Sequence, residues 1–162
     1  MNILLFLTPK QEVAFLYEDF TIAQALKVME RVRYSSIPII RRTGEYVGTV
    51  TEGDLLWRIR KLENGFADAD KTPLKGIPHH KDNKPLKASM SIEDLLQTST
   101  EQNFAPVVDD RGMFIGIITR KRVITYLCQL APGRRIDRIA DLLSACGSRC
   151  DFKLRGKPGL FH

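Results

Sequence analysis

The sequence predicts an α/β (α+β) fold built from one structural unit that occurs twice, and three patterns support this prediction. Residues 44–51 (GEYVGTVT) and 112–119 (GMFIGIIT) are similar and lie 68 positions apart. A short apolar strand with a proline precedes each segment, and these prolines, Pro38 and Pro106, are separated by the same 68 positions. Further upstream, a helical pattern occurs twice, as TIAQAL and as SIEDLL. Several matches in one order indicate an internal duplication.

Each copy is predicted to begin with a short strand and an amphipathic helix. Thr21 and Ser91 are residue types that favour the position just before a helix, and Asp94 provides the acidic partner of a capping box with Ser91. In the first copy, apolar residues follow at the spacing of a buried helix face. These residues are Ile22, Ala25, Leu26 and Met29.

A strand, a turn, a strand and a second helix complete each copy, giving the order strand–helix–strand–turn–strand–helix. The turns at 42–45 and 109–112 contain glycine, which adopts a positive φ without strain. The second helices are predicted from two apolar faces, Leu55, Ile59 and Leu62 in the first copy and Val123, Leu127 and Leu130 in the second.

We expect four segments along the chain. Residues 1–62 form the first copy, 63–76 a linker, 77–131 the second copy and 132–162 a basic C-terminal extension. The linker is polar and contains glycine and proline, so it is predicted to have little structure of its own.

The composition predicts a globular protein. The 162 residues are 43% hydrophobic and 27% charged. No apolar run approaches the roughly 18 residues of a membrane-spanning helix, and the N-terminal residues do not resemble a signal peptide. Three widely spaced cysteines do not form a disulfide framework, so we expect a cytoplasmic location. Residues 133–162 carry +4 of the net charge of +6, and the nearly balanced remainder does not predict a nucleic-acid partner.

The duplicated pattern resembles the cystathionine-β-synthase (CBS) domain, present twice as in a stand-alone bacterial Bateman module. The resemblance covers about residues 3–130 and is carried by TIAQAL, YSSIPII and GTVTEGDLL, and then by SIEDLL, NFAPVV and GIITRKRVI. It implies two subdomains that are related by a pseudo-two-fold axis and packed through their sheets. It also implies two clefts, commonly occupied by adenine nucleotides, and a homodimer.

The resemblance assigns an adenosine site to the first copy. It implies that Asp54 binds the ribose, whose hydroxyls a carboxylate can accept, and that Thr51 binds the phosphate. We expect Asp54 to lie at the mouth of the cleft rather than in the core. The alternative is that Thr51 and Asp54 only cap the following helix. The residues that would flank the base or form the other wall are Thr8, Val13, Ala14, Tyr34, Ser35, Ser36 and Ile37.

The second copy departs from the family pattern because Arg122 stands where the aspartate is expected. Arginine has only donors and cannot accept from ribose, but it can bind a phosphate through two hydrogen bonds. The second cleft is therefore either lost or adapted to a more anionic ligand. No metal site is expected, because His79 and His80 would point to opposite faces of a strand. The other candidates here are Pro78, His79, Lys84, Asn103, Phe104, Thr119 and Arg120.

These observations favour a regulatory module that senses an adenine nucleotide and acts on an unknown partner protein, with no membrane and no required cofactor. AMP, ADP or ATP is the expected ligand, and cyclic di-AMP is an alternative because residues 119–122 (TRKR) are rich in donors. No catalytic residues are predicted, since no nucleophile, acid–base pair or metal motif is found. A nucleic-acid-associated regulator that uses the basic extension is a further alternative.

Overall fold

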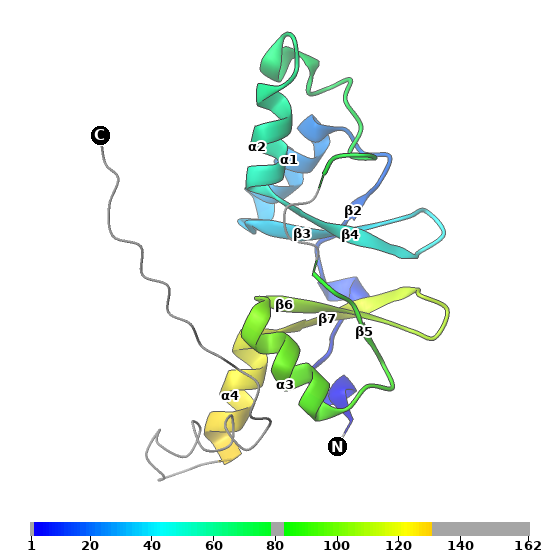
Figure 1. Ribbon diagram of the computed structural model, residues 1–162, viewed down its shortest axis with the longest axis vertical. Helices are drawn as coiled ribbons and strands as arrows, with labels where there is room; N and C mark the ends of the chain where they lie inside the picture. Colours follow the sequence, from blue (N-terminus) through cyan, green and yellow to red (C-terminus); the bar gives the residue numbers. More distant parts are fainter. Residues whose placement is uncertain (1, 79–82, 131–162) are drawn as a thin grey trace, which may run out of the picture. The chain divides into compact units, whose positions relative to one another are not determined.

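The structure, a computed structural model, describes residues 2–78 and 83–130. The predicted α/β fold is confirmed, since the described residues form four α-helices and two β-sheets (Figure 1). Met1–Tyr126 form one compact unit, and the second unit, Leu127–His162, contributes only the end of the last helix to the described residues. Within this part of the chain, no helix is long and apolar enough to cross a membrane. The four predicted domain segments stay predictions.

The first copy contains a three-stranded sheet with two helices. The strand order is β2-β3-β4, in which β2 is parallel to β3 and β3 is antiparallel to β4. The elements are β2 (Leu16–Tyr17), α1 (Ile22–Val32), β3 (Ser36–Ile40), β4 (Tyr46–Thr51) and α2 (Glu52–Arg60). The predicted apolar helix faces pack against the sheet in one core. This core includes Ile22, Ala25, Met29, Ile37, Ile39, Val50, Leu55 and Ile59.

The second copy repeats this arrangement. Its sheet has the order β1-β7-β6-β5, with β5 parallel to β6 and β6 antiparallel to β7. The copy's own elements are β5 (Leu86–Lys87), α3 (Ile92–Glu101), β6 (Phe104–Val108), β7 (Phe114–Thr119) and α4 (Arg120–Leu130). Leu95, Val107 and Ile118 are almost completely buried, so they correspond to the core residues of the first copy.

The first strand of the chain joins the sheet of the second copy. β1 (Thr8–Pro9) lies between two short 3-10 helices, Ile3–Phe6 and Lys10–Glu12, and pairs antiparallel with β7. Pro9 lies opposite Gly116, and a Cβ at that glycine would collide with the carbonyl oxygen of Thr8. The absence of a side chain at Gly116 therefore permits the close approach of the two backbones.

The two sheets face each other about a pseudo-two-fold axis, and their hairpins are joined by reciprocal hydrogen bonds. The backbone N–H of Tyr46 donates to the carbonyl oxygen of Gly112 at 3.2 Å, and that of Phe114 donates to Gly44 at 2.9 Å. The rings of Tyr46 and Phe114 stack with their centroids 6.3 Å apart. Val13, Ile40 and Phe114 form a small buried cluster beside this contact.

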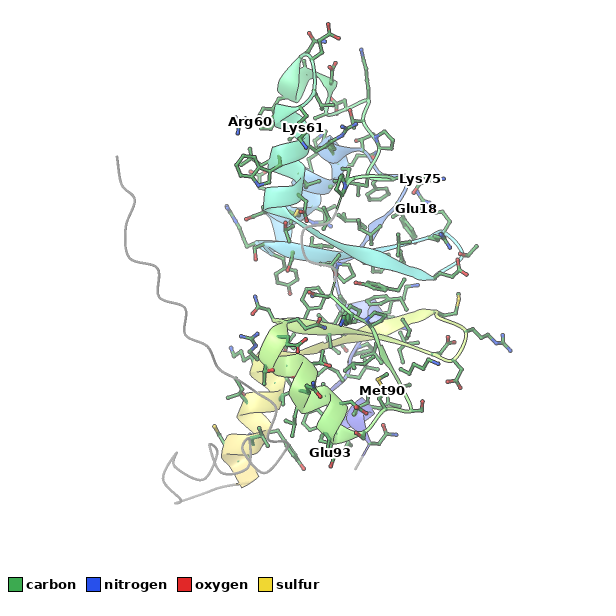
Figure 2. The ribbon with its side chains drawn as sticks, in the orientation of Figure 1. Glu18, Arg60, Lys61, Lys75, Met90 and Glu93 are labelled. Carbon is green, nitrogen blue, oxygen red and sulfur yellow. The ribbon has the colours of Figure 1, made fainter. Side chains whose placement is uncertain are left out.

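Residues 63–76 are more structured than predicted. They include a 3-10 helix, Gly65–Asp68, and Leu74 is buried in the first core with 1% of its surface exposed. The backbone N–H of Lys75 donates to the carbonyl oxygen of Glu18 at 3.0 Å (Figure 2). The prediction of little structure was wrong because a few apolar residues in a polar stretch suffice to anchor it.

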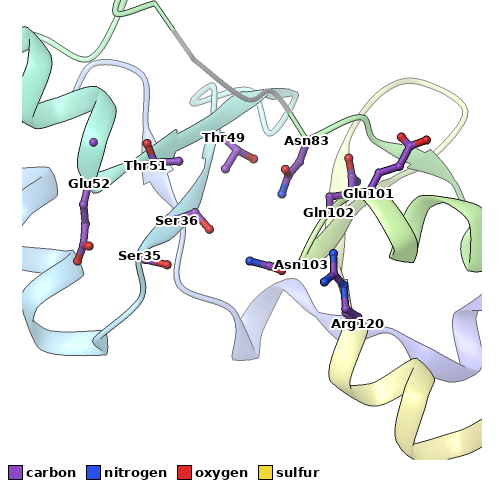
Figure 3. A pocket seen from close by; sticks show the side chains of 11 residues that line it. Ser35, Ser36, Thr49, Thr51, Glu52, Asn83, Glu101, Gln102, Asn103 and Arg120 are labelled. Atoms are coloured by element: carbon purple, nitrogen blue, oxygen red, sulfur yellow. The ribbon is translucent and has the colours of Figure 1, made fainter. Parts of the chain in front are cut away.

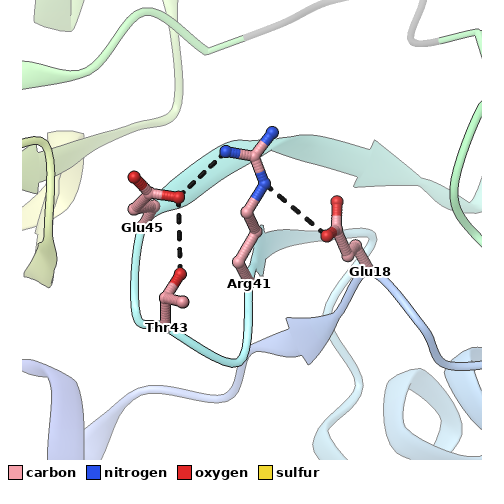
Figure 4. A network of polar contacts seen from close by, with 4 residues as sticks. All are labelled: Glu18, Arg41, Thr43 and Glu45. Atoms are coloured by element: carbon pink, nitrogen blue, oxygen red, sulfur yellow. Dashed lines mark hydrogen bonds and ion pairs between the residues drawn. The ribbon is translucent and has the colours of Figure 1, made fainter.

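A polar network lies at the turn between β3 and β4 (Figure 4). Nη1 of Arg41 donates to Oε2 of Glu45 at 2.9 Å, and Nε of Arg41 lies 3.5 Å from Oε1 of Glu18. Oγ1 of Thr43 also donates to Oε2 of Glu45, at 3.3 Å. The hydrogen bond from Arg41, with the attraction of its charge, holds the pKa of the Glu45 carboxyl below its usual value. The same bond, followed by the charge of Glu18, raises the pKa of Arg41.

Candidate functional site

A polar pocket of about 550 Å³ lies where the two copies meet, near the starts of β3 and β6 (Figure 3). Its volume falls within the range of about 300–1,000 Å³ that is common for small-molecule sites. Both copies contribute residues to it. The pocket is lined by Ser35, Ser36, Thr49, Thr51, Glu52, Gly53, Asn83, Glu101, Gln102, Asn103 and Arg120.

The wall from the first copy carries hydroxyl groups. Ser35 and Ser36 precede or begin β3, while Thr49 and Thr51 lie on β4. Thr49 and Thr51 face the same side of the sheet because alternate residues of a strand do so. The helix α2 begins at Glu52, so the positive end of its dipole lies at this wall.

The wall from the second copy carries amides and a cation. Its polar side chains include those of Asn83, Gln102, Asn103 and Arg120. Glu52 and Glu101 add two carboxylates, but both residues are exposed and lie at opposite margins of the view in Figure 3. The pocket therefore offers hydroxyls on one side and donors with one positive charge on the other.

Arg120 holds an unpaired donor in this wall. Its Nη2 lies 3.5 Å from the carbonyl oxygen of Thr100, and its backbone N–H donates to Asn103 at 2.9 Å. Its Nε is buried, and no acceptor among the described residues reaches it. A buried donor without a partner costs about 1–3 kcal/mol, which an acceptor on a ligand would offset. The geometry therefore suits an anionic group next to Arg120.

Thr51 and Asp54 form a capping box at the start of α2. Oδ2 of Asp54 accepts from the backbone N–H of Thr51 at 2.9 Å and from its hydroxyl at 2.8 Å. The backbone N–H of Asp54 donates to Oγ1 of Thr51 at 3.1 Å. Asp54 is 5% exposed and is not among the residues that line the described pocket, so it is more buried than expected, while its ribose contact stays a prediction.

The position of Thr8 also differs from the expected one. The resemblance placed Thr8 in the first cleft, yet β1 brings it to the second copy. There Nη1 of Arg122 donates to Oγ1 of Thr8 at 3.2 Å, and the backbone N–H of Arg122 donates to Oγ1 of Thr119 at 3.3 Å. Arg122 is exposed and is not among the residues that line the described pocket.

The pocket brings together Ser35, Ser36, Thr51, Asn103 and Arg120 from the residues predicted by sequence. Other predicted residues lie outside it, and their proposed contacts with a ligand stay predictions. Val13, Ile37 and Phe104 are buried, Ala14 is partly buried, and Tyr34, Pro78 and Lys84 are exposed. His79 lies outside the described residues, as does the extension at 132–162. No group of three or more His, Cys, Asp or Glu that could hold a metal ion occurs within the described ranges.

The sequence reasoning did not predict six of the residues that line the pocket, namely Thr49, Glu52, Gly53, Asn83, Glu101 and Gln102. Thr49 could have been found from its spacing of two from Thr51 on a predicted strand. Asn83 and Gln102 lie outside strands and helices, and only long-range contacts bring them to the pocket.

The CBS domain model matches the chain twice, over residues 7–61 and 75–129. A CBS domain-containing protein of Arabidopsis thaliana, the chloroplastic CBSX2, is 28% identical over 149 residues, which cover 77% of this chain. The match covers 63% of that relative, so this chain spans less than two thirds of its length.

Solved structures show the same fold. The crystal structure of CbpB in complex with c-di-AMP has a TM-score of 0.74 and 20% identity, and the match covers 88% of this chain and 91% of CbpB. The crystal structure of CBSX2 in complex with AMP has a TM-score of 0.63 and 24% identity, with 80% and 97% coverage.

Proposed function

The chain belongs to the CBS domain family, with two copies in tandem, and we propose that it is a regulatory module that binds an adenine nucleotide in the described pocket. The proposal includes no catalytic step. Binding would bias the arrangement of the two copies, and a partner protein would detect that arrangement.

One observation carries this proposal, namely the buried Nε of Arg120, which no acceptor among the described residues reaches in a pocket lined by both copies. A phosphate provides the missing acceptor and the complementary charge. The hydroxyls of Ser35 and Ser36 and the start of α2 provide further donors for phosphate or ribose on the opposite wall.

The relatives support two ligands. CbpB was crystallised with c-di-AMP and CBSX2 with AMP. AMP has one phosphate and one base, so the hydroxyl wall of the first copy and Arg120 would provide most of its contacts. Cyclic di-AMP has two of each, and a pocket that both copies line suits such a ligand. A second nucleotide site around Thr119 and Arg122 stays a prediction, as does the ribose contact of Asp54.

A homodimer is also part of the proposal. Leu56 on α2 and Ile124 on α4 are 52% and 51% exposed, and they occupy equivalent positions of the two copies, 68 residues apart. Exposed apolar side chains at positions related by pseudo-symmetry suit burial against a second copy. Light scattering at micromolar concentration should give a dimer mass, and Leu56→Glu should shift it toward the monomer. A monomer mass for the unchanged protein would contradict this part.

The ligand is tested first by denaturing the purified protein and identifying any released nucleotide by mass spectrometry. Calorimetric titration with AMP, ATP and cyclic di-AMP then measures affinity. Arg120→Ala should weaken binding by about ten- to a hundredfold, because a charged hydrogen bond contributes about 1.5–3 kcal/mol.

Arg122→Ala is the matched control for Arg120→Ala. It removes a nearby arginine that does not line the described pocket, so affinity should change less than threefold. Failure of the unchanged protein to bind any of the three nucleotides would contradict the proposed function. A loss of affinity in Arg122→Ala alone would instead favour a site in the second copy.

A further inference from the structure

The segment Asn83–Lys84 is fixed by side chains from both copies. The hydroxyl of Tyr46 on β4 donates to the carbonyl oxygen of Asn83 at 2.9 Å. The amide of Gln102, at the end of α3, makes two bonds to the backbone of Lys84. Its Nε2 donates to the carbonyl oxygen at 3.1 Å, and its Oε1 accepts from the N–H at 3.0 Å. These three hydrogen bonds fix the backbone at Asn83 and Lys84, and so the position of the Asn83 side chain.

The Asn83 side chain is itself oriented. Its Nδ2 donates one hydrogen to the carbonyl oxygen of Phe104 at 3.0 Å. Its Oδ1 and its second amide hydrogen have no partner among the described residues. Asn83 lines the pocket, and Figure 3 shows its amide between Thr49 and Gln102. The pocket thus contains a fixed amide that can accept one hydrogen bond and donate another.

We propose that Asn83 determines the base specificity of the pocket, by binding the N6 amino group and N7 of adenine and rejecting purines with a C6 carbonyl. This inference rests on the proposed nucleotide binding. An asparagine amide pairs with adenine in this way because adenine presents a donor next to an acceptor. Hypoxanthine and guanine present two acceptors on the same edge, so one of them would face Oδ1 without a hydrogen bond.

The first copy has no side chain equivalent to the amide of Asn83. In this part of the two copies the offset is 70 residues, as between β2 and β5, so the first-copy residue that corresponds to Asn83 is Val13. Val13 is apolar and 8% exposed, so its side chain has no group to read a base edge. Discrimination between bases therefore depends on a single side chain, and a single substitution should remove it.

The test compares AMP with IMP, which carries a carbonyl in place of the C6 amino group and a proton on N1, by calorimetric titration of the full chain. The unchanged protein should bind AMP more tightly than IMP by between about fivefold and 150-fold, the range of a good bidentate contact. Asn83→Ala should bind both with similar affinity. AMP that lacks N7 (7-deaza-AMP) should bind the unchanged protein more weakly than AMP, and Asn83→Ala should not distinguish the two.

Asn103→Ala is the control within the same pocket. It removes an amide with no role in the proposed base contact, so it should keep the preference for AMP whatever its effect on overall affinity. Gln102→Ala should reduce the AMP/IMP ratio without abolishing binding, because it releases the backbone that positions Asn83. If only cyclic di-AMP binds, the same ratio is measured against cyclic di-GMP.

The outcomes separate this inference from the proposed function. If the unchanged protein binds AMP or cyclic di-AMP but Asn83→Ala retains the full base preference, the role of Asn83 is refuted and the proposed function stands. Equal affinity of the unchanged protein for AMP and IMP also refutes it. Absence of any nucleotide binding refutes both.

Discussion

Asp54→Ala should destabilise the protein far more than the equivalent change in the second copy. The capping boxes Thr51–Asp54 and Ser91–Asp94 have the same form, with hydroxyl-to-carboxylate distances of 2.8 Å in both. Their burial differs, because Asp54 is 5% exposed whereas Asp94 is exposed to solvent. Water can replace the carboxylate at Asp94 but has little access at Asp54. The comparison therefore contrasts a buried and an exposed capping box of the same form.

The magnitudes follow from these contacts. Loss of an exposed cap costs about 0.5–1 kcal/mol, which is the expected effect of Asp94→Ala. Asp54→Ala also leaves the N–H of Thr51 without its partner in a shielded site, so the total should reach about 2–4 kcal/mol. For a unit of this size, about 4 °C of Tm corresponds to 1 kcal/mol. The expected losses of Tm are therefore about 8–16 °C for Asp54→Ala and about 2–4 °C for Asp94→Ala.

Thermal melting followed by circular dichroism measures both variants, and urea unfolding at 25 °C checks the free energies. Nucleotide affinity of Asp54→Ala is then measured at a temperature where the variant is fully folded. Equal Tm losses in the two variants would refute the argument from burial. An unchanged Tm with weakened AMP binding would favour the ribose role that the resemblance assigns to Asp54.

Three further predictions concern the fold. Leu74→Ala should lower the free energy of unfolding in urea by about 2–4 kcal/mol, because the side chain is 1% exposed in the first core, while Phe66→Ala, 67% exposed, should change it by less than about 0.5 kcal/mol; equal effects would contradict the packing of 63–76. Gly116→Ala should separate β1 from β7, seen as faster amide hydrogen exchange at Leu7 and Thr8, and unchanged exchange would contradict the close approach. Glu45→Gln should lower Tm slightly at pH 7, and this difference from the unchanged protein should vanish as the pH falls through the lowered pKa of Glu45; a difference that grows in acid would contradict the ion pair with Arg41.

The signs of the pH effect follow from the direction of the shift. The pKa of Glu45 is lower in the folded protein than in the unfolded chain, so its ionised form stabilises the fold. That stabilisation is present above the unfolded pKa and is lost as the carboxyl takes up a proton in acid. Because the pair is exposed, added salt should weaken it as well.

The repeated elements could be predicted because their signals are local. The caps at Thr21 and Ser91, the apolar helix faces and the glycine-containing turns each depend on residues a few positions apart. The capping alternative for Thr51 and Asp54 was available for the same reason. The burial of Asp54 could not be predicted in this way, because it depends on how α2 packs against the rest of the first copy.

The remaining features depend on contacts between distant residues. The strand at Thr8 has only two residues, and nothing in its sequence distinguishes a partner in the first copy from one in the second. Asn83 is a pocket residue because Tyr46, 37 positions earlier, and Phe104, 21 positions later, hold it there. A pattern with a period of two or 3.6 residues carries no information on such pairs.

The pairing of β1 with β7 has a consequence for the order of events during synthesis. Thr8 is synthesised more than a hundred residues before its partner Ile117. At about 5–20 residues per second, the first strand waits on the order of 5–20 s for its place in a sheet. During that interval the first copy can build its own core, since β2, β3 and β4 form a sheet of their own among the described residues. The pairing of β1 with β7 then completes the second sheet. A nascent chain halted before residue 117 would carry β1 as an exposed, unpaired strand.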